Sequence, residues 1–142
     1  AEDTMAAFGD DRVMLFTGAQ KPAESKTIEL TDEVKSIFYD QSRFGLVYDG
    51  GSGGKNHRLE IYNLSGNAYM KVDFETDYTN VEIMENGEVC VLGEDSCEIF
   101  NKKGICKFQY RFQKYLYKVI PGKTQVSYTF ILEDETQRVK LK

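Results

Sequence analysis

Short apolar runs, each bounded by Gly, Asn or Asp, recur about every ten residues along the chain. β-Branched and aromatic residues dominate these runs. No stretch combines an apolar period of 3.6 residues with a cap at each end. The pattern therefore predicts an all-β chain. The runs that we expect to form strands are 12–16, 34–39, 44–48, 57–62, 68–74, 80–84, 88–92, 96–100, 105–112, 115–120, 125–132 and 137–141.

One of these strands, together with the turn that follows it, occurs twice. The segment Glu60-Ile61-Tyr62-Asn63-Leu64-Ser65-Gly66 returns as Glu98-Ile99-Phe100-Asn101-Lys102-Lys103-Gly104, an offset of 38 residues (98 − 60 = 38). A period near 40 that is built from short strands is typical of propeller blades. The repeat therefore predicts a partial β-propeller.

The predicted strands fall into about four blade-like repeats of antiparallel strands. Residues 33–76 and 77–113 form two complete units of four strands, whereas residues 1–32 and 114–142 form two incomplete ones. We interpret residues 1–142 as a single domain and as the C-terminal part of a longer protein. Because unfinished blades leave strand edges open, we expect a protein partner or self-association at those edges.

Charge is segregated along the chain, which has a net charge of −5. Residues 73–100 contain nine acids and no Lys or Arg, and residues 101–123 contain bases and no acids. The negative total disfavours nucleic acid as a partner, because phosphate binding needs many clustered bases. A candidate patch for an anionic ligand or polymer lies within residues 102–123. Its members are Lys102, Lys103, Lys107, Arg111, Lys114 and Lys118.

The basic segment also has a purely structural interpretation. Period-2 alternation places Phe108, Tyr110 and Phe112 on one face of a strand and the bases on the other, which is typical of a half-buried strand. If residues 101–104 form a two-residue hairpin, Lys107 lies opposite Glu98 and the acidic hairpin neutralises its neighbour. The sequence leaves both interpretations open.

Three cysteines are candidates for a metal site or a disulfide. Two-residue hairpins at 93–96 and 101–104 would put Leu92 opposite Cys97, and both Cys90 and Cys106 opposite Ile99, with all three sulfurs on one face of one sheet. Metal ligands usually follow a C-x-x-C spacing, which is absent, and Cys90 and Cys106 lie two strands apart. We expect free, buried thiols, no metal and no cofactor.

Two other motifs have structural explanations. The glycine-rich segment 49–56 differs from a phosphate-binding loop, because Asp49 replaces the first Gly and Asn56 replaces the magnesium-binding Ser or Thr. We interpret it as a flexible hairpin loop, either native or an engineered spacer. Asn63-Leu64-Ser65 matches a glycosylation sequon, but Asn101 occupies the equivalent turn without one, so the Asn is expected to serve the turn.

The repeated Ile-aromatic-Asn-x-x-Gly turn, with the 73–78 connection and Cys97-Glu98-Ile99-Phe100-Asn101, resembles an uncharacterised family. That family consists of propeller-like extracytoplasmic domains of Gram-positive bacteria that begin with a single membrane anchor. The resemblance implies an extracytoplasmic location, with membrane attachment only through an anchor outside this soluble chain. It supplies no catalytic residues.

No nucleophile is paired with a plausible His, and His57 is the only histidine, so we expect no enzymatic activity. The function that we expect is a non-enzymatic protein-interaction or scaffolding module at the cell surface. The alternative is a sensor or carrier domain that binds an anionic ligand through residues 102–123.

Overall fold

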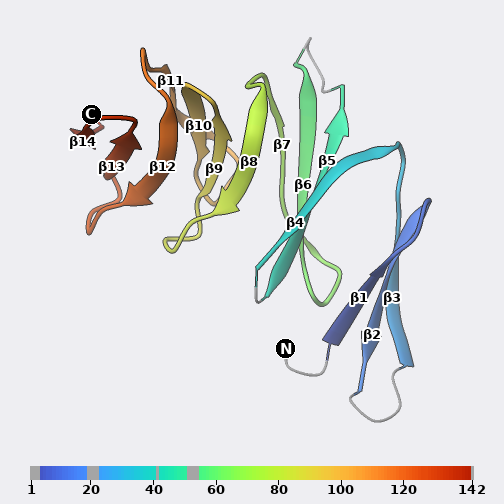
Figure 1. Cartoon of the computed structure of the whole chain (residues 1–142). Coiled ribbons are helices and arrows are strands. Elements are labelled where there is room, and N and C mark those ends of the chain that lie inside the picture. The colour runs from blue at the N-terminus through green and yellow to red at the C-terminus, as the bar shows by residue number, and fades with distance from the viewer. Residues whose placement is uncertain (1–3, 19–22, 41, 51–54, 142) are drawn as a thin grey trace. The chain divides into compact units, whose positions relative to one another are not determined.

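The computed structural model describes residues 4–18, 23–40, 42–50 and 55–141. These residues form fourteen strands and no helix, in four antiparallel sheets (Figure 1). No described segment is therefore a helix able to cross a membrane. Contacts divide the chain into two compact units, residues 1–74 and residues 75–142, and each unit holds two sheets.

Unit 1 contains a three-stranded sheet and a four-stranded sheet. The first has the order β1-β2-β3 and the second has the order β4-β5-β6-β7. The bounds are β1 Thr4–Phe8, β2 Arg12–Thr17, β3 Ala23–Glu29, β4 Val34–Tyr39, β5 Arg43–Asp49, β6 His57–Asn63 and β7 Ala68–Phe74.

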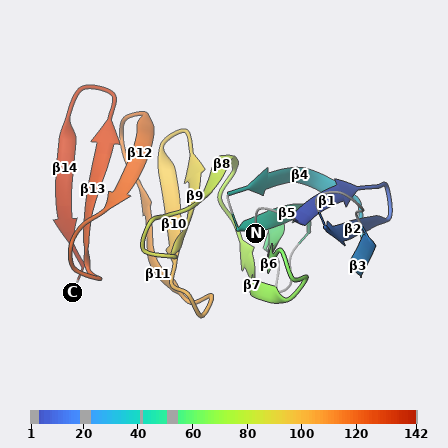
Figure 2. The same cartoon turned by 90° about the horizontal axis from the view of Figure 1, so that it is seen from below.

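Unit 2 contains a four-stranded sheet and a three-stranded sheet, which lie side by side in both views (Figures 1 and 2). Their orders are β11-β10-β9-β8 and β12-β13-β14. The bounds are β8 Tyr78–Ile83, β9 Val89–Gly93, β10 Ser96–Phe100, β11 Cys106–Arg111, β12 Leu116–Pro121, β13 Ser127–Leu132 and β14 Thr136–Lys140. No sheet of the described residues closes on itself, so each has two edge strands.

The twelve strands expected from the sequence are all present, which confirms the all-β prediction. Strands β1 and β3 were not anticipated individually. Their sequences, TMAAF and AESKTIE, are rich in Ala or in charged residues and lack the β-branched and aromatic alternation by which the other strands are recognised. They form because each pairs along its whole length with β2, which is apolar.

The repeated turns have the same geometry. Asn63 Oδ1 accepts hydrogen bonds from the backbone N–H groups of Ser65 and Asn67, and Asn101 Oδ1 accepts the equivalent bonds from Lys103 and Ile105. Gly66 and Gly104 have φ of 83° and 82°, which L side chains rarely adopt. The expectation that the sequon Asn serves the turn is confirmed.

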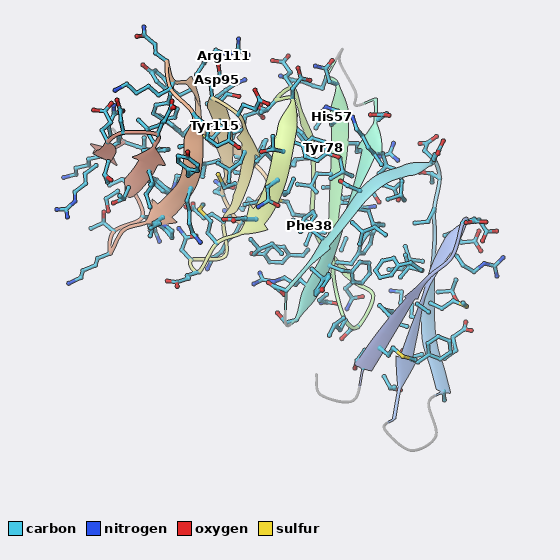
Figure 3. All side chains as sticks on the ribbon, in the orientation of Figure 1. Phe38, His57, Tyr78, Asp95, Arg111 and Tyr115 are labelled. Atoms are coloured by element: carbon cyan, nitrogen blue, oxygen red, sulfur yellow. The ribbon has the colours of Figure 1, made fainter. Side chains whose placement is uncertain are left out.

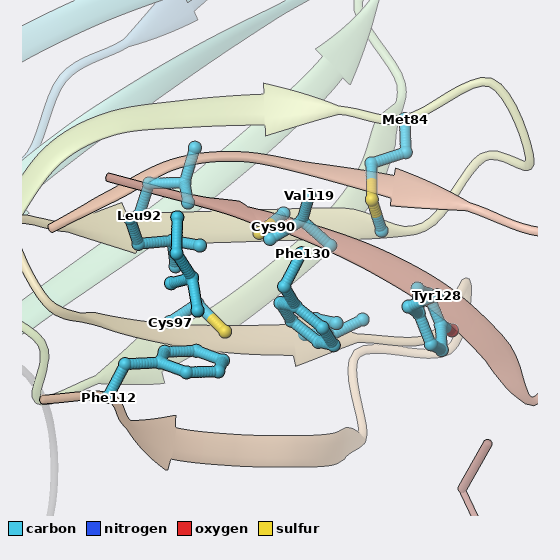
Figure 4. Packing of buried hydrophobic residues seen from close by; sticks show 11 residues of the cluster. Met84, Cys90, Leu92, Cys97, Phe112, Val119, Tyr128 and Phe130 are labelled. Carbon is cyan, nitrogen blue, oxygen red and sulfur yellow. The ribbon is translucent and has the colours of Figure 1, made fainter. Parts of the chain in front are cut away.

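The core of unit 2 fills the space between its two sheets (Figure 4). Phe130 is fully buried, and its ring centroid lies 5.4 Å from that of Phe108 and 5.2 Å from that of Phe112. Cys90 and Cys97 join this cluster from adjacent strands as buried free thiols. The cluster contains eleven buried residues and so holds the two sheets together through apolar burial.

The predicted register around the cysteines is correct between β9 and β10 and wrong between β10 and β11. Cys97 lies opposite Leu92 and Cys90 lies opposite Ile99, as expected. A register shift between Ile99 and Phe100 places Cys106 opposite Phe100 instead of Ile99, and Cys106 is exposed. The expectations that Cys106 is buried and that it shares a face with Cys90 and Cys97 were therefore wrong. The prediction of two-residue geometry at this hairpin was also wrong, because Asn101 bonds to Ile105 across a three-residue turn and a bulge follows in the pairing.

Candidate functional site at the edge of strand β4

Strand β4 is an edge strand that carries exposed apolar side chains. Among the described strands it pairs only with β5. Its Ile37 and Tyr39 side chains are 45% and 83% exposed. Each lies opposite a core residue of β5, Ile37 opposite Leu46 and Tyr39 opposite Phe44. Since cross-strand partners share a face, both side chains project on the side of the sheet that packs against β1–β3.

The opposite face of β4 is fixed by a close approach to Gly45. A Cβ atom built on Gly45 would lie 2.0 Å from Cζ of Phe38, so only glycine leaves room for that ring to lie across the strand. Figure 3 labels Phe38 on β4. The ring covers a position that has no side chain of its own, so β4 is held against β5, its one partner strand among the described residues.

A groove of about 460 Å³ lies beside this edge, in the range of small-ligand and peptide sites. One wall is the turn between β1 and β2, and the other is β4 with the residues that precede it. The lining residues are Phe8, Gly9, Asp10, Leu30, Glu33, Val34, Lys35, Ser36, Ile37 and Leu46. Phe8 is 42% exposed and packs edge-to-face on Phe44, with ring centroids 5.7 Å apart. Phe8 therefore gives the groove an apolar surface that is packed against the core.

Of the three charged side chains in the described lining of the groove, one has an oppositely charged partner. Lys35 Nζ lies 3.3 Å from Asp49 Oδ1, so the one base among the described lining residues is already paired. The side chains of Asp10 and Glu33 are exposed and form no hydrogen bond or ion pair with any described residue. The groove is thus negative at its rim and apolar within.

Unit 2 contains a polar cluster of a different kind around Glu88, which is 7% exposed. Its carboxylate accepts hydrogen bonds from Lys107 Nζ at 2.8 Å, from Asn86 Nδ2 at 2.7 Å and from the Tyr128 hydroxyl. Lys107 Nζ also donates to the Gln125 carbonyl at 2.6 Å. The cluster links the turn before β9 to β11 and β13, so it fastens the two sheets of unit 2 together.

The hydrogen bonds in this cluster set its protonation. Burial acts to raise the pKa of the Glu88 carboxyl, but the hydrogen bonds from its three partners outweigh burial and lower that pKa. Burial and the hydrogen bond to the carboxylate raise the pKa of the Tyr128 hydroxyl. The arrangement is therefore an ionised acid held by a cation and a neutral phenol, all three with partners. These hydrogen bonds give the cluster a structural role between the two sheets.

Acidic side chains pair with three of the six bases in the candidate anionic-ligand patch. Lys107 binds Glu88, and the predicted pairing of Lys107 with Glu98 is wrong because Gln109 lies opposite Glu98. Lys114 Nζ lies 2.7 Å from Asp134 Oδ1 and 3.5 Å from Glu135 Oε1. Arg111 Nε lies 3.8 Å from Asp95 Oδ1 (Figure 3).

The other three bases of the patch, Lys102, Lys103 and Lys118, are exposed and have no ion pair with any described residue. Lys102 and Lys103 are adjacent at the tip of the β10–β11 hairpin, whereas Lys118 lies on β12 in the next sheet. Among the described residues, three of the six bases are therefore uncompensated, and two of these, Lys102 and Lys103, are neighbours.

Two acids at equivalent positions of the repeat are both structural. Glu98 is 4% exposed, and its Oε1 accepts bonds from Gln109 Nε2 and from the backbone N–H and hydroxyl of Thr76. Glu60 Oε1 accepts a bond from the Tyr62 hydroxyl at 2.6 Å, which with burial raises the pKa of that phenol. The repeated Glu thus anchors local structure in each unit.

Other candidate motifs form no site among the described residues. The segment 51–54 of the glycine-rich loop lies outside them. No group of three His, Cys, Asp or Glu side chains in the described part of the chain could hold a metal ion. His57 is buried, and its Nδ1 lies 3.6 Å from Asp49 Oδ1.

Comparison with known proteins gives a family and a fold. Residues 1–141 match the model of a "Family of unknown function (DUF5711)". No curated protein matches the chain. It is similar in structure to a protein of unknown function from Bacteroides caccae, with a TM-score of 0.50 and 10% sequence identity. That match covers 98% of this chain and 57% of the other, so the chain spans little more than half of that protein. At this identity the similarity shows the fold alone.

Proposed function

This chain belongs to that family of unknown function, DUF5711, and from this premise we propose that it is a non-enzymatic protein-interaction module. The observation that carries the proposal is the pair of exposed apolar side chains on the edge strand β4. Natural proteins usually protect edge strands with charge, Pro or a covering segment. Here the edge presents Ile37 and Tyr39, which are 45% and 83% exposed.

We also propose that the four sheets are blades of a partial β-propeller. Its support is the 38-residue offset between Glu60 and Glu98, which occupy the third strand of successive four-stranded sheets. Sheets of this kind act as a rigid scaffold that presents turns and edges. The resemblance of the repeated turns to extracytoplasmic domains supports a place at the cell surface, with the anchor outside this chain.

The experiment compares partner capture by the natural protein and by two matched variants in the native cells, using cross-linking and mass spectrometry. Ile37→Lys places a charge on the β4 edge, and Ile105→Lys places the same charge at a 60% exposed position of unit 2. We expect a partner that is lost with Ile37→Lys and kept with Ile105→Lys. A partner set unchanged by Ile37→Lys contradicts the proposal.

A second candidate function is binding of an anionic ligand or polymer through residues 102–123. The observation that favours it is the adjacent, uncompensated pair Lys102 and Lys103 at the hairpin tip. Salt-sensitive binding to a polyanion that the double charge reversal Lys102→Glu/Lys103→Glu abolishes would support it. Binding that survives this change removes it.

A further inference from the structure

We infer that copies of this chain associate head to tail, with the outer face of the β12–β14 sheet of one copy packed on the outer face of the β1–β3 sheet of the next. Here the outer face is the side of a sheet that is turned away from the core of its own unit. The inference goes beyond the proposed function, since it uses neither β4 nor the groove beside it. Sheets with apolar faces pack on one another about 10 Å apart.

The outer face of the β1–β3 sheet carries an apolar patch. The core residues of β2 alternate with Met14 and Phe16, which therefore lie on the outer face. Ala7 and Met5 of β1 lie opposite them and share this face. Met5 is 54% exposed, and the other three side chains are half-buried. A contiguous apolar patch of this kind is typical of an interaction surface.

Acids border this patch. Glu24 of β3 lies opposite Phe16. Glu29 lies opposite Arg12, whose Nε is already 3.0 Å from Asp11 Oδ1. Glu24 and Glu29 are exposed and form no ion pair with any described residue. The first face is therefore apolar with a negative border.

The outer face of the β12–β14 sheet carries a second apolar patch. The core residues of β12 and β13 alternate with Ile120 and Ile131, which therefore lie on the outer face. Ile120 is 39% exposed, and Ile131 is half-buried. Tyr115 and Tyr117 flank the core residue Leu116, so they lie on this side as well, 42% and 59% exposed, with ring centroids 4.8 Å apart.

Bases border this second patch. Lys118 lies opposite Ile131, and Arg138 and Lys140 lie on the same face of β14. The three bases are exposed and form no ion pair with any described residue. Glu133, an exposed acid just beyond the end of β13, offsets them only in part. The last face is therefore apolar with a positive border.

The opposite borders decide which faces meet. Two β1–β3 faces would bring acids together and two β12–β14 faces would bring bases together, and both arrangements are repulsive. Contact between unlike faces buries both apolar patches and places acids beside bases. Such a contact is heterologous, so it repeats from copy to copy.

The test is sedimentation of the whole chain between about 10 µM and about 1 mM, because a face three strands wide favours a weak contact. Met5→Lys puts a base in the first patch, and Ile120→Asp puts an acid in the second. We expect the whole chain to form dimers and larger species, and each variant alone to stay monomeric because one of its faces is blocked. A whole chain that stays monomeric over this range overturns the inference.

Mixing the two variants identifies the faces. Each variant keeps the face that the other has lost, so an equimolar mixture should form dimers and nothing larger. Such dimers also show that both variants are folded. Ile105→Lys, at a 60% exposed position outside both sheets, should leave association unchanged. The inference is overturned if the mixture stays monomeric while both variants keep the circular dichroism of the whole chain, or if either variant alone associates as well as the whole chain.

Charge reversal tests the complementarity of the borders. The double variants Glu24→Lys/Glu29→Lys and Lys118→Glu/Arg138→Glu should each weaken association at least about threefold. A chain with all four changes has a basic first face and an acidic last face, so its association should return to within about twofold of the original. A fourfold variant that associates no better than the two double variants overturns the inference.

Ile37→Lys separates this contact from the proposed function. It should leave sedimentation unchanged, because Ile37 lies on neither of the two faces. Association that Ile37→Lys abolishes would make β4 the contact between copies and overturn the inference. A chain that is monomeric but still captures a cellular partner through Ile37 also overturns it, and leaves the proposed function standing.

Discussion

The spaces between paired sheets are filled differently in the two units. In unit 2 a cluster of eleven buried residues fills the space between the two sheets. Hydrogen bonds among Glu88, Lys107 and Tyr128 also join these sheets. In unit 1 the corresponding cluster has six buried members among the described residues, and a groove of about 460 Å³ opens beside β4.

The difference separates two uses of the same strand arrangement. Where aromatic rings and a satisfied ion pair fill the space between sheets, as around Phe130, close packing stabilises the structure. Where the filling stops, as between Phe8 and Ile37, apolar surface and unpaired carboxylates face solvent. Under the proposed function, unit 2 is the stable support and unit 1 presents the contact surface.

The largest expected effect comes from removing the central ring of unit 2. Phe130→Ala should lower the free energy of unfolding by about 3–5 kcal/mol, because a fully buried ring leaves a cavity. Phe8→Ala, at a half-exposed ring of the groove, should cost about 1 kcal/mol or less. Urea unfolding followed by circular dichroism measures both. Equal losses would contradict the contrast between the units.

The next effect concerns the acid that joins the sheets of unit 2. Glu88→Gln removes the charge that holds Lys107 and the Tyr128 hydroxyl, and should cost about 2 kcal/mol. Glu85→Gln, at an exposed residue of the same turn, should stay within about 0.5 kcal/mol. The same urea titration compares them, and the account fails if the two variants lose the same stability.

The pH dependence of unit 2 follows from the lowered pKa of Glu88. A carboxyl whose pKa is lower in the folded chain contributes its full stability above its unfolded pKa of about 4.3, and loses it as the pH falls through the folded value. Hydrogen exchange of β9 should therefore quicken as the pH drops below about 4, after correction for intrinsic rates. Glu88→Gln should flatten this dependence; an unchanged slope would exclude Glu88 as its source.

The smallest effect compares the repeated turns. Asn63→Ala and Asn101→Ala each remove two hydrogen bonds to backbone N–H groups, and each should cost about 1 kcal/mol. Thermal unfolding of the two single variants measures this. Because the geometry is the same in both units, a large loss at one position with none at the other would contradict the structural equivalence of the repeat.

Much of the fold could be predicted from the sequence because its signals are local. The alternation of apolar residues gave twelve strands, and the Asn and Gly of the repeated turns gave their geometry. The bulge between Ile99 and Phe100 could not be predicted from a two-residue turn, and it moved Cys106 and Lys107 relative to β10. Strand β3 forms through pairing with β2, which its own composition does not indicate.

The groove could not be predicted, because its residues are distant in the sequence. The lining residues near Phe8 belong to the first sheet, whereas Glu33–Ile37 and Leu46 belong to the second sheet or directly precede it, so they meet only when the two sheets of unit 1 pack. A partial signal was present in Ile37-Phe38-Tyr39, three consecutive large apolar residues that cannot all face one core. In the basic patch, by contrast, bases that are close in the sequence pair with different acids, so they do not form one continuous basic surface.

The most direct test of the central claim is hydrogen exchange of the β4 backbone, measured residue by residue with and without the partner whose cross-linking depends on Ile37. If that partner contacts this edge, the amides of Val34–Tyr39 gain protection, while those of β14 in unit 2 keep their exchange rates. Protection elsewhere with none at β4, in the presence of the bound partner, would contradict the account.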